Sequence, residues 1–408
     1  MKTILMLPYG YILAHVVRLL EIAKELKKRR YKIIFAGAGH YLHLIKKEGF
    51  DVLSLLEANH QNLMSAIRKN KIKFIGFEEL ENLVKADISL YRKINPNLVL
   101  SDGRISALLS TRIYGVLHGA IVNASSTEYR SVPYLPLLPF LTKTDLKKVW
   151  QTLQMFNVKL ECKVFNLLMR NYTKLSKKYR LNKPVKTSEF LTGSDFTLFP
   201  DLPEYFPTYN LPQNFYYIGP ITWKSNLTAP SWFTTLRDDK SVIYITMGST
   251  TQRDIYKLIH QLFKNLNYQV VITTGEQLKD KKMFLIPGKI FIEDYVNGDL
   301  IMKKSKVVIC HGGNGTIYQA IKNGVPIIGI PTHHDQSYNM KRVESLKIGI
   351  KLDYNKFRKS PQLLIIALQK ILTNSHFYKA IEKYQKIIER YNPIKRAVNI
   401  IEKYIKKI

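Results

Sequence analysis

One stretch of the sequence reads Val307-Val-Ile-Cys-His-Gly-Gly-Asn-Gly-Thr-Ile-Tyr-Gln-Ala-Ile-Lys-Asn-Gly-Val-Pro-Ile-Ile-Gly-Ile-Pro331. Four apolar residues run directly into the glycine-rich segment 311–316, and a helical pattern follows it. Gly324 suits the C-terminal cap of that helix, and Pro326 prevents its continuation before the next apolar run. The stretch therefore predicts a compact strand–helix–strand unit whose glycines lie at the helix N-terminus.

A turn of this kind is suited to binding a diphosphate. Glycines let backbone N–H groups approach an anion closely, and the helix dipole places about half a positive charge there. Thr316 adds a hydroxyl donor and His311 an imidazole donor. Alone, such a turn is a weak signal, because tight turns need glycine anyway. The segment lacks a Walker-type lysine pattern and a GxGxxG spacing, which argues against P-loop and dinucleotide sites.

Short apolar runs alternate with helical patterns along the rest of the chain. Nearly continuous apolar strands separated by helices are typical of parallel sheets covered on both faces. We therefore expect an α/β protein with two doubly wound halves and a Pro/Gly-containing joint near 215–230. The expected strands are 3–7, 32–35, 51–55, 97–101 and 120–123 in the first half, and 241–246, 269–273, 289–292, 306–310 and 326–330 in the second.

Helical spacing appears in four further segments. Apolar residues recur every three or four positions in 16–28 and in 105–114. The stretch 142–180 is expected to be mostly helical. The closing segment 377–408 predicts two amphipathic helices broken at Asn392-Pro393.

Length and composition limit the classes of protein to which this chain can belong. A chain of 408 residues is longer than a domain with a single hydrophobic core usually is. Its hydrophobic content of 46% is enough to form two such cores. The two cysteines, Cys162 and Cys310, fit no metal spacing or disulfide framework, as in a reducing compartment. The run 3–7 precedes no signal-cleavage site, and no stretch approaches the ~20 apolar residues that span a bilayer. We expect a soluble cytoplasmic protein.

The net charge of +32, from 63 Lys+Arg against 31 Asp+Glu, attracts anions. A composition bias of the genome explains it equally well. The charge is uneven, because residues 141–190 carry 12 Lys/Arg against 3 Asp/Glu and follow the apolar run 132–141. This combination suits an anionic membrane interface, or a solvated helical face beside a buried loop. No nucleic-acid recognition module is present, so we expect no nucleic-acid partner.

The glycine-rich segment belongs to a longer ordered pattern. After residues 311–316 come Gly324-Val-Pro326 and then Pro331-Thr-His-His-Asp-Gln-Ser-Tyr-Asn339. This order resembles the donor-site signature of the UDP-glycosyltransferase superfamily, whose members have the GT-B fold. Val242-Ile-Tyr-Ile-Thr-Met-Gly-Ser249 and Tyr217-Ile-Gly-Pro220 look like the family's strand beside the phosphates and its interdomain junction.

The resemblance implies two Rossmann-like domains that face each other across a cleft. Residues 1–215 would form the acceptor-binding domain, and residues 216–385 would form the nucleotide-sugar donor domain. Residues 386–408 would form a C-terminal helix that packs back on the first domain.

The resemblance also assigns donor-binding residues. Asp335 and Gln336 would bond the sugar hydroxyls, and Tyr295 and Val296 would lie against the base. Gln319 stands where many members carry a glutamate for the ribose, and an amide bonds a hydroxyl without charge. Asn297-Gly298 replace the Pro-Gln of plant members, so the resemblance does not decide between a UDP-sugar and a TDP-sugar as the donor. The residues implied to hold the diphosphate are Ser249, His311, Gly313, Gly315 and Thr316.

A catalytic pair is predicted in the first half. Deprotonating an acceptor alcohol needs a general base, for which histidine is well matched near neutral pH. His15 follows the first strand, and Ala14-His15 resembles the family's Gly-His. Asp102 ends the strand 97–101 and resembles the acidic partner of that base. Two structural alternatives stay open: His15 as a helix-start residue packed under a loop, and Asp102 as the N-cap of the helix from Ile105.

Together these residues imply a metal-independent hexosyltransferase that moves a hexose from a UDP-sugar, or another NDP-sugar, to an acceptor hydroxyl with inversion. The sequence is compatible with two kinds of acceptor: a small hydrophobic alcohol, and a lipid or lipid-linked glycan. No cofactor is expected beyond the nucleotide sugar, because the helix N-terminus can neutralise the leaving diphosphate. His40 with His43, and His333 with His334 and Asp335, hint at metal spacing, but we interpret them as surface or substrate-binding residues.

Two alternatives have a different function. A UDP-sugar 2-epimerase of the same fold also needs the diphosphate turn, but it needs no base such as His15. A non-catalytic sugar-nucleotide-binding or membrane-docking subunit would bind the nucleotide without turnover.

Overall fold

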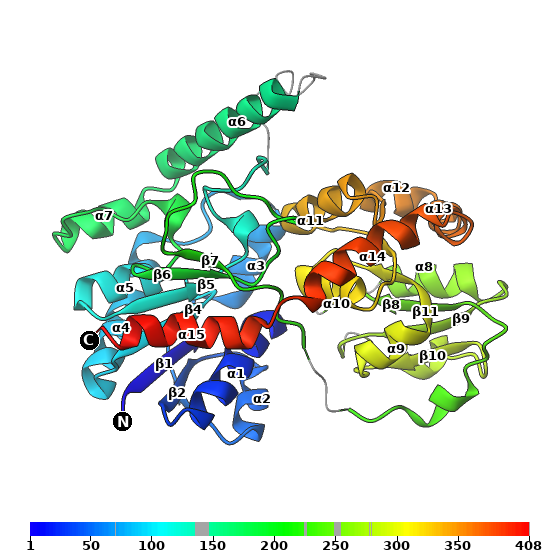
Figure 1. Ribbon diagram of the computed structural model, residues 1–408, viewed down its shortest axis with the longest axis horizontal. Coiled ribbons are helices and arrows are strands. Elements are labelled where there is room, and N and C mark those ends of the chain that lie inside the picture. The colour runs from blue at the N-terminus through cyan, green and yellow to red at the C-terminus, as the bar shows by residue number, and fades with distance from the viewer. Residues whose placement is uncertain are drawn as a thin grey trace. The chain divides into compact units, whose positions relative to one another are not determined.

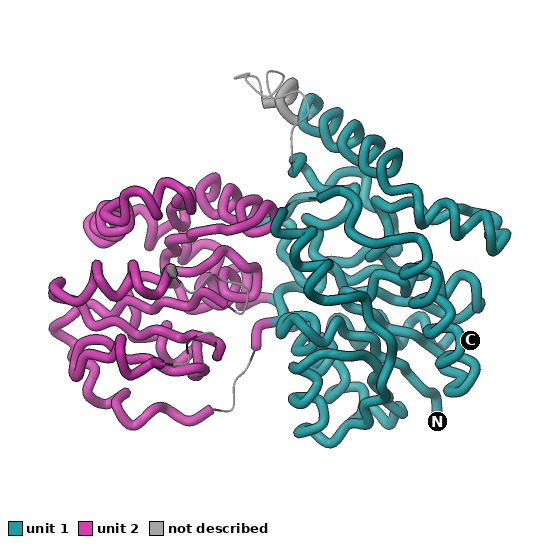
Figure 2. The backbone as a smooth tube through the Cα atoms, turned by 180° about the vertical axis from the view of Figure 1, so that it is seen from behind, with its two compact units in different colours: residues 1–221, 391–408 teal, residues 222–390 magenta. Residues whose placement is uncertain are grey.

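The computed structural model describes residues 1–69, 71–134, 147–223, 227–248, 254–276, 278 and 280–407. The chain forms two compact units: unit 1 combines Met1–Ile221 with Tyr391–Ile408, and unit 2 comprises Thr222–Arg390 (Figure 2). The sequence suggested divisions after residues 215 and 385. The observed divisions lie a few residues later, because the last strand of unit 1 begins at Phe215 and the last helix of unit 2 extends to Glu389.

Unit 1 contains one parallel sheet, whose strand order in the described residues is β3-β2-β1-β4-β5-β6-β7 (Figure 1). The strands are β1 (Thr3–Pro8), β2 (Lys32–Gly37), β3 (Asp51–Ser54), β4 (Leu98–Asp102), β5 (His118–Ile121), β6 (Phe196–Phe199) and β7 (Phe215–Tyr217). The helices are α1 (Leu13–Lys28), α2 (Leu42–Lys47), α3 (His60–Arg68), α4 (Phe77–Ile94), α5 (Ala107–Tyr114), α6 (Lys147–Leu168), α7 (Asn171–Lys178) and α15 (Pro393–Ile405), with 3₁₀ turns η1 (Ala124–Ser126) and η3 (Thr187–Glu189).

Unit 2 repeats this plan with a six-stranded sheet in the order β10-β9-β8-β11-β12-β13. Its strands are β8 (Val242–Thr246), β9 (Gln269–Thr273), β10 (Ile290–Glu293), β11 (Ser305–Cys310), β12 (Ile327–Gly329) and β13 (Gly349–Lys351). Its helices are α8 (Asp254–Phe263), α9 (Gly298–Lys304), α10 (Asn314–Lys322), α11 (His334–Ser345), α12 (Tyr354–Lys359), α13 (Gln362–Leu372) and α14 (His376–Glu389), with 3₁₀ turns η4 (Ser231–Thr235) and η5 (Lys281–Phe284). The expected α/β fold with two parallel sheets is confirmed.

The sheet of unit 1 is covered on both faces, as the alternation along β1 shows. Ile4 and Met6 pack with α1 and α15, whereas Leu5 and Leu7 pack with the cluster that contains Tyr91 of α4. All four β1 side chains are fully buried. Successive side chains of a strand point to opposite faces, so an uninterrupted apolar run fits a strand buried on both sides.

The C-terminal helix α15 belongs to unit 1. Its Ala397, Val398, Ile401 and Ile405 are fully buried in the core formed by β1, β2 and α1. Arg29 at the end of α1 donates to Glu402 across 2.9 Å, and the Tyr216 and Tyr404 hydroxyls lie 3.1 Å apart. The core contacts explain why the last helix, distant in sequence, lies beside the first one in Figure 1.

Some elements differ from the sequence expectation. Strands β6, β7 and β13 were not predicted, and two of them contain only three residues, too few for a recognisable pattern. β5 ends at Ile121, so Asn123 lies beyond the strand in which we expected it. The helical stretch expected over 142–180 is interrupted after Leu168, and residues 142–146 lie outside the described residues.

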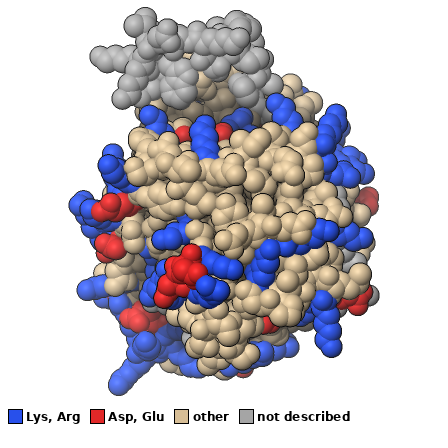
Figure 3. All heavy atoms as spheres, turned by 90° about the vertical axis from the view of Figure 1, so that its right-hand side faces the viewer, with Lys and Arg blue, Asp and Glu red and all other residues tan. Residues whose placement is uncertain are grey.

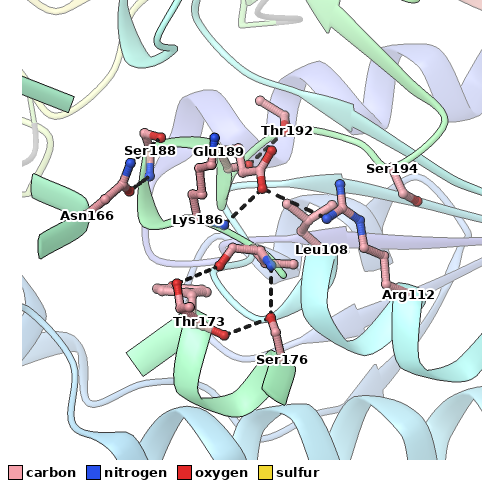
Figure 4. A network of polar contacts seen from close by, with 12 residues as sticks. Leu108, Arg112, Asn166, Thr173, Ser176, Lys186, Ser188, Glu189, Thr192 and Ser194 are labelled. Carbon is pink, nitrogen blue, oxygen red and sulfur yellow. Dashed lines mark hydrogen bonds and ion pairs between the residues drawn. The ribbon is translucent and has the colours of Figure 1, made fainter. Parts of the chain in front are cut away.

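Polar contacts attach α6 and α7 to unit 1, as the close view of η3 in Figure 4 shows. Ser188 N–H donates to Asn166 Oδ1 at 2.8 Å, and Asn166 Nδ2 donates to Ser188 Oγ at 3.0 Å. Ser176 of α7 accepts from the Val185 backbone at 2.9 Å. These contacts fix the C-terminal end of α6, and Glu161, nearer the middle of the helix, pairs with Arg130 at 2.6 Å. The helix lies at the outside of the unit (Figure 1).

Candidate active site

His15 and Asp102 lie together because they follow neighbouring parallel strands. Pro8, the last residue of β1, is in register with Asp102, the last residue of β4. The strand order reverses between β1 and β4, and ligands of doubly wound sheets bind at such switch points, beyond the carboxyl ends of the strands. His15 lies in the first turn of α1, directly after this edge.

The two side chains form a direct hydrogen bond between His15 Nδ1 and Asp102 Oδ1. Asp102 is fully buried, whereas the His15 side chain keeps 24% of its surface exposed. Among the described residues only Nδ1 of this imidazole has hydrogen-bond partners. The other ring nitrogen, Nε2, therefore stays available for a proton from outside the protein.

The structure excludes the alternative for Asp102 and retains part of the alternative for His15. Helix α5 begins at Ala107 and its N-cap is Ser106, so Asp102 does not cap it. His15 does lie at a helix start, yet its ring reaches a buried carboxylate and remains partly exposed.

A third member of this group, Arg18, was not predicted from the sequence. Its Nε donates to Asp102 Oδ2 at 2.8 Å and its Nη2 donates to Asp102 Oδ1 at 2.7 Å. Its Nη1 donates to Oδ1 of Asn123, beyond β5, at 2.8 Å. Arg18 follows His15 by three positions, so the helical spacing alone placed the two on one face of α1.

Aromatic side chains lie beside His15 in the same unit. Tyr9 presents its ring edge to His15, with 6.3 Å between ring centroids. The Tyr9 hydroxyl is 2.9 Å from His60 Nδ1, and the His60 ring stacks on Tyr11 at 4.3 Å. Burial lowers the pKa of His60, which favours its neutral form. No sequence pattern indicated this cluster, because α3 carries His60 and lies far from β1 in the chain.

The glycine-rich turn lies at the corresponding switch point of unit 2, between β8 and β11. It connects β11 to α10, whose N-cap is Gly313. Gly312 has a φ of +88°, and a Cβ there would lie 2.8 Å from Cγ of Met340. The Asn339 side chain of α11 donates to the carbonyl of Gly312 at 3.0 Å, which holds the turn against α11.

His311 is held between two glycines. A Cβ added to Gly248, after β8, would lie 2.6 Å from its Cε1, and one added to Gly313 would lie 2.5 Å from its Nε2. Burial, together with the neighbouring His333, lowers the pKa of His311 to about 4. A backbone hydrogen bond with Thr246 acts in the opposite direction, but burial has the larger effect, so the imidazole is neutral near neutral pH and carries one N–H.

The first turn of α10 has an open face and unpartnered polar atoms. A Cβ added to Gly315 would meet no atom within 4 Å. Both polar side-chain atoms of Asn314, and Nδ1 of His311, are buried without a hydrogen-bond partner among the described residues. Thr316 is half-buried in the same turn. This combination suits an anion that accepts hydrogen bonds at the helix N-terminus. Ser249, the remaining predicted phosphate ligand, lies outside the described residues.

The predicted sugar-binding residues lie on α11. Asp335 is half-buried in its first turn. Gln336 is buried, and its Oε1 accepts from the backbone N–H and hydroxyl of Thr332 at 2.9 and 3.1 Å. At least part of the Gln336 side chain is therefore used to fix the turn before α11.

The predicted base and ribose residues occupy the neighbouring loops. Val296 is buried after β10, and Tyr295 packs edge-to-face on Trp223 at 6.3 Å. Gln319 of α10 donates through Nε2 to Oδ1 of Asp299, 3.2 Å away on α9. The sequence analysis did not include Asp299, because only the packing of α9 on α10 brings the two together.

No group of three or more metal-ligating side chains occurs within the part of the chain that the structure describes. His40 and His43 contact each other through the His40 carbonyl, which accepts from His43 Nδ1 at 2.6 Å. No helix among the described residues has the length and apolar character needed to cross a bilayer.

Comparisons with known proteins find similarity in sequence and in fold. The model of the glycosyltransferase family 28 C-terminal domain matches residues 242–397. A "PGL/p-HBAD biosynthesis glycosyltransferase" of Mycobacterium tuberculosis (strain ATCC 25177 / H37Ra) is 28% identical over 385 residues, which cover 93% of this chain and 86% of that protein. A "PGL/p-HBAD biosynthesis rhamnosyltransferase" of Mycobacterium bovis (strain BCG / Pasteur 1173P2) is 29% identical over 387 residues, with coverage of 93% and 82%.

Among solved structures, the calicheamicin glycosyltransferase CalG4 superimposes with a TM-score of 0.72. The alignment covers 100% of this chain and 99% of that chain, at 17% identity. At this identity the likeness concerns the fold.

Proposed function

Because the chain belongs to the superfamily of nucleotide-sugar glycosyltransferases with the GT-B fold, we propose that it transfers a hexosyl group to an acceptor hydroxyl with inversion. The donor is a UDP-sugar or another NDP-sugar. One observation carries the proposal: His15 is hydrogen-bonded through Nδ1 to a fully buried aspartate, while its ring remains partly exposed.

In this mechanism Nε2 of His15 removes the proton from the acceptor hydroxyl. The acceptor oxygen forms a bond to the anomeric carbon as the bond from that carbon to the diphosphate oxygen breaks. A single displacement inverts the anomeric configuration, and the proton remains on His15 until solvent accepts it. Asp102 stabilises the imidazolium that forms, and such general-base assistance typically contributes about 10²–10⁴-fold to the rate.

The N-terminus of α10 is proposed to bind the diphosphate of the donor. The glycines of its first turn, the neutral His311 imidazole and the Thr316 hydroxyl would donate hydrogen bonds, together with Ser249. The helix dipole would offset the charge of the leaving diphosphate. We propose that the reaction is therefore independent of metal ions, and that activity persists in excess EDTA.

The remaining donor contacts follow from the neighbouring loops. Asp335 and Gln336 would bond the sugar, Tyr295 and Val296 would lie against the base, and Gln319 would bond the ribose. The 29%-identical relative is named a rhamnosyltransferase, so deoxyhexose donors belong in the substrate panel.

A lipid or lipid-linked acceptor at a cytoplasmic membrane face is supported by the surface of α6. Phe156, Leu167 and Leu168 are 52%, 57% and 43% exposed. The exposed cations Lys159 and Lys163 lie between Phe156 and Leu167, at spacings that place these four residues on one helix face. Exposed apolar side chains among cations fit an anionic lipid surface. On the face drawn in Figure 3, the Lys and Arg side chains are spread rather than gathered.

Vesicle binding tests this surface. Phosphatidylcholine vesicles with phosphatidylglycerol should bind the protein, and binding should weaken with salt. Lys159→Glu with Lys163→Glu should lower binding about tenfold or more, at about 1 kcal/mol per cation. Ile366→Ser, at an exposed apolar position of unit 2, is the matched control. If vesicle binding changes neither with salt nor in the double variant, a small soluble alcohol is the acceptor that we propose instead.

Nucleotide release tests the reaction. UDP- and TDP-sugars are offered with a crude lipid extract, and release is compared between the wild type, His15→Ala and Thr316→Ala. We expect acceptor-dependent release that falls about 10²-fold or more in His15→Ala while nucleotide binding is retained. Thr316→Ala should weaken nucleotide binding about tenfold. An epimerised sugar unaffected by His15→Ala would indicate the 2-epimerase, and binding without release would indicate a non-catalytic subunit.

A further inference from the structure

Arg18 makes more contacts to the Asp102–His15 pair than charge balance requires. Its guanidinium forms a two-point contact with the carboxylate, through Nε to Oδ2 and through Nη2 to Oδ1. The Arg18 and Asp102 side chains are 8% and 0% exposed. A buried carboxylate needs a partner, and a single ion pair would meet that need. A planar two-point contact also fixes the orientation of the carboxylate.

The orientation is fixed from a third strand as well. Asn123, beyond β5, accepts from Nη1 of Arg18 at 2.8 Å. The guanidinium therefore extends from α1 to the last residue of β4 and to Asn123 beyond β5. Rotation of the Asp102 carboxylate would break both contacts with Arg18, so Oδ1 stays directed at Nδ1 of His15.

Arg18 also acts on the charge of His15. Its Nη2 lies 2.9 Å from His15 Nδ1, close enough for its positive charge to oppose protonation of the ring. Asp102 acts in the opposite sense. The other titratable groups that face the ring are Tyr9, at its edge, and behind Tyr9 the side chain of His60. Arg18 is the permanent cation nearest to the ring among these groups.

We propose that Arg18 is a positioning residue of the base: it holds Asp102 in the orientation that fixes His15, and its positive charge beside the ring acts against that of the Asp102 carboxylate. This inference rests on the proposed function of His15 as the base. It adds that removal of the Arg18 charge makes the ring protonate at higher pH, since Asp102 is then no longer shared.

The test follows the His15 ring directly by NMR titration of the free protein, in wild type and in Arg18→Gln. His15→Asn identifies the His15 resonances. In Arg18→Gln the pH at which half of the His15 rings carry a second proton should rise by about one unit or more. Asn123→Ala removes one hydrogen bond from Arg18, so it should shift this midpoint pH in the same direction but by less. This variant replaces Arg18→Gln in the test if Arg18→Gln does not fold. Arg29→Gln is the control, because Arg29 lies on the same helix and pairs with Glu402.

Turnover provides the second readout. In Arg18→Gln, the acid limb of the pH–rate profile should move to higher pH by the same amount as the midpoint of the His15 titration. The maximal rate should fall about tenfold or more. Arg18→Lys keeps the positive charge but lacks the planar guanidinium. Its His15 ring should therefore titrate as in the wild type, whereas its maximal rate should stay low. A folded Arg18→Gln whose ring titrates as in the wild type, or the same shift in Arg29→Gln, would overturn the proposal. Absence of turnover in the wild type would overturn the proposed function and leave the titration result interpretable.

Discussion

Gly248 lies directly against the imidazole of His311: a Cβ at this glycine would be 2.6 Å from Cε1 and 2.8 Å from Nε2 of the histidine. The contact joins the end of β8 to the turn after β11, the two strands between which the order of the sheet reverses. The position of the proposed diphosphate ligand therefore depends on the absence of a side chain on the neighbouring strand.

Gly248→Ala should displace His311 and weaken nucleotide binding about tenfold or more. Because Gly248 also has a φ of +64°, the substitution adds backbone strain of about 1 kcal/mol. Gly288→Ala separates the two effects, since Gly288 has a φ of +71° and no atom within 4 Å of an added Cβ. Calorimetric titration with UDP and TDP should show weakened binding in Gly248→Ala alone. Equal weakening in both variants would mean that strain, rather than His311, sets the affinity.

The buried group of Glu57, Arg104 and Asp87 predicts how stability changes with pH. Arg104 contacts Glu57 at 2.7 Å and Asp87 at 2.6 Å, so two carboxylates share one guanidinium. Burial raises the pKa of Glu57 from 4.5 to about 7, although Arg104 acts in the opposite direction. The folded state therefore holds a proton that the unfolded state has lost between these two values. The stabilisation is complete below about pH 4.5 and is lost as the pH rises through about 7.

Glu57→Gln should remove this dependence. Relative to the wild type, its free energy of unfolding should rise by up to roughly 3 kcal/mol between pH 5 and pH 8, at about 1.4 kcal/mol per pKa unit. Urea unfolding at a series of pH values measures the difference. Glu48→Gln, at a more exposed ion pair with Lys24, should show no such trend. A wild type and Glu57→Gln variant with parallel pH profiles would refute the assignment.

The docking of α15 on unit 1 predicts a local effect on stability. Ile401 is fully buried in the core that contains β1 and α1. Ile401→Ala removes three carbon atoms from a packed site, which typically costs about 2–5 kcal/mol. Ile366→Ala is the matched control, because Ile366 is 59% exposed and should change stability by less than about 0.5 kcal/mol. Hydrogen exchange of peptides from β1 and β9 should show lost protection in unit 1 alone.

The sequence predicted the parts of the site that depend on strand ends. His15 and Asp102 each follow an apolar run, and carboxyl ends of parallel strands meet at one edge, so their proximity could be inferred. Arg18 was missed although it lies three residues after His15. Its role depends on Asn123, and that contact requires the β1-β4-β5 order. Strand order is set by packing of the whole sheet, which a local pattern does not contain.

The glycine-rich turn was predicted from its motif, and the contacts that support it were not. Glycine spacing and Pro326 indicated the strand–helix–strand unit. The contact of Asn339 with the Gly312 carbonyl joins elements whose packing the local pattern does not specify. Short edge strands such as β7 and β13 carry three residues each and leave no periodic signal.

The last prediction concerns the contact between Asp299 and Gln319, the residue that the family resemblance assigns to the ribose. Burial alone would raise the pKa of Asp299, but hydrogen bonds from Lys322 and Asn323 hold it below its usual value, so the group is a carboxylate. Its Oδ1 accepts from Gln319 Nε2 at 3.2 Å. Gln319→Glu would therefore place two carboxylates in contact, and like charges at this separation repel.

We expect Gln319→Glu to lower the free energy of unfolding by about 1–3 kcal/mol and to weaken nucleotide binding. Asp299→Asn removes the repulsion, so the double variant should be more stable than the sum of the two single changes predicts. A double-mutant cycle by urea unfolding measures this coupling, which should favour the pair by about 1 kcal/mol or more. Additive effects would show that Asp299 does not determine which residue is tolerated at position 319.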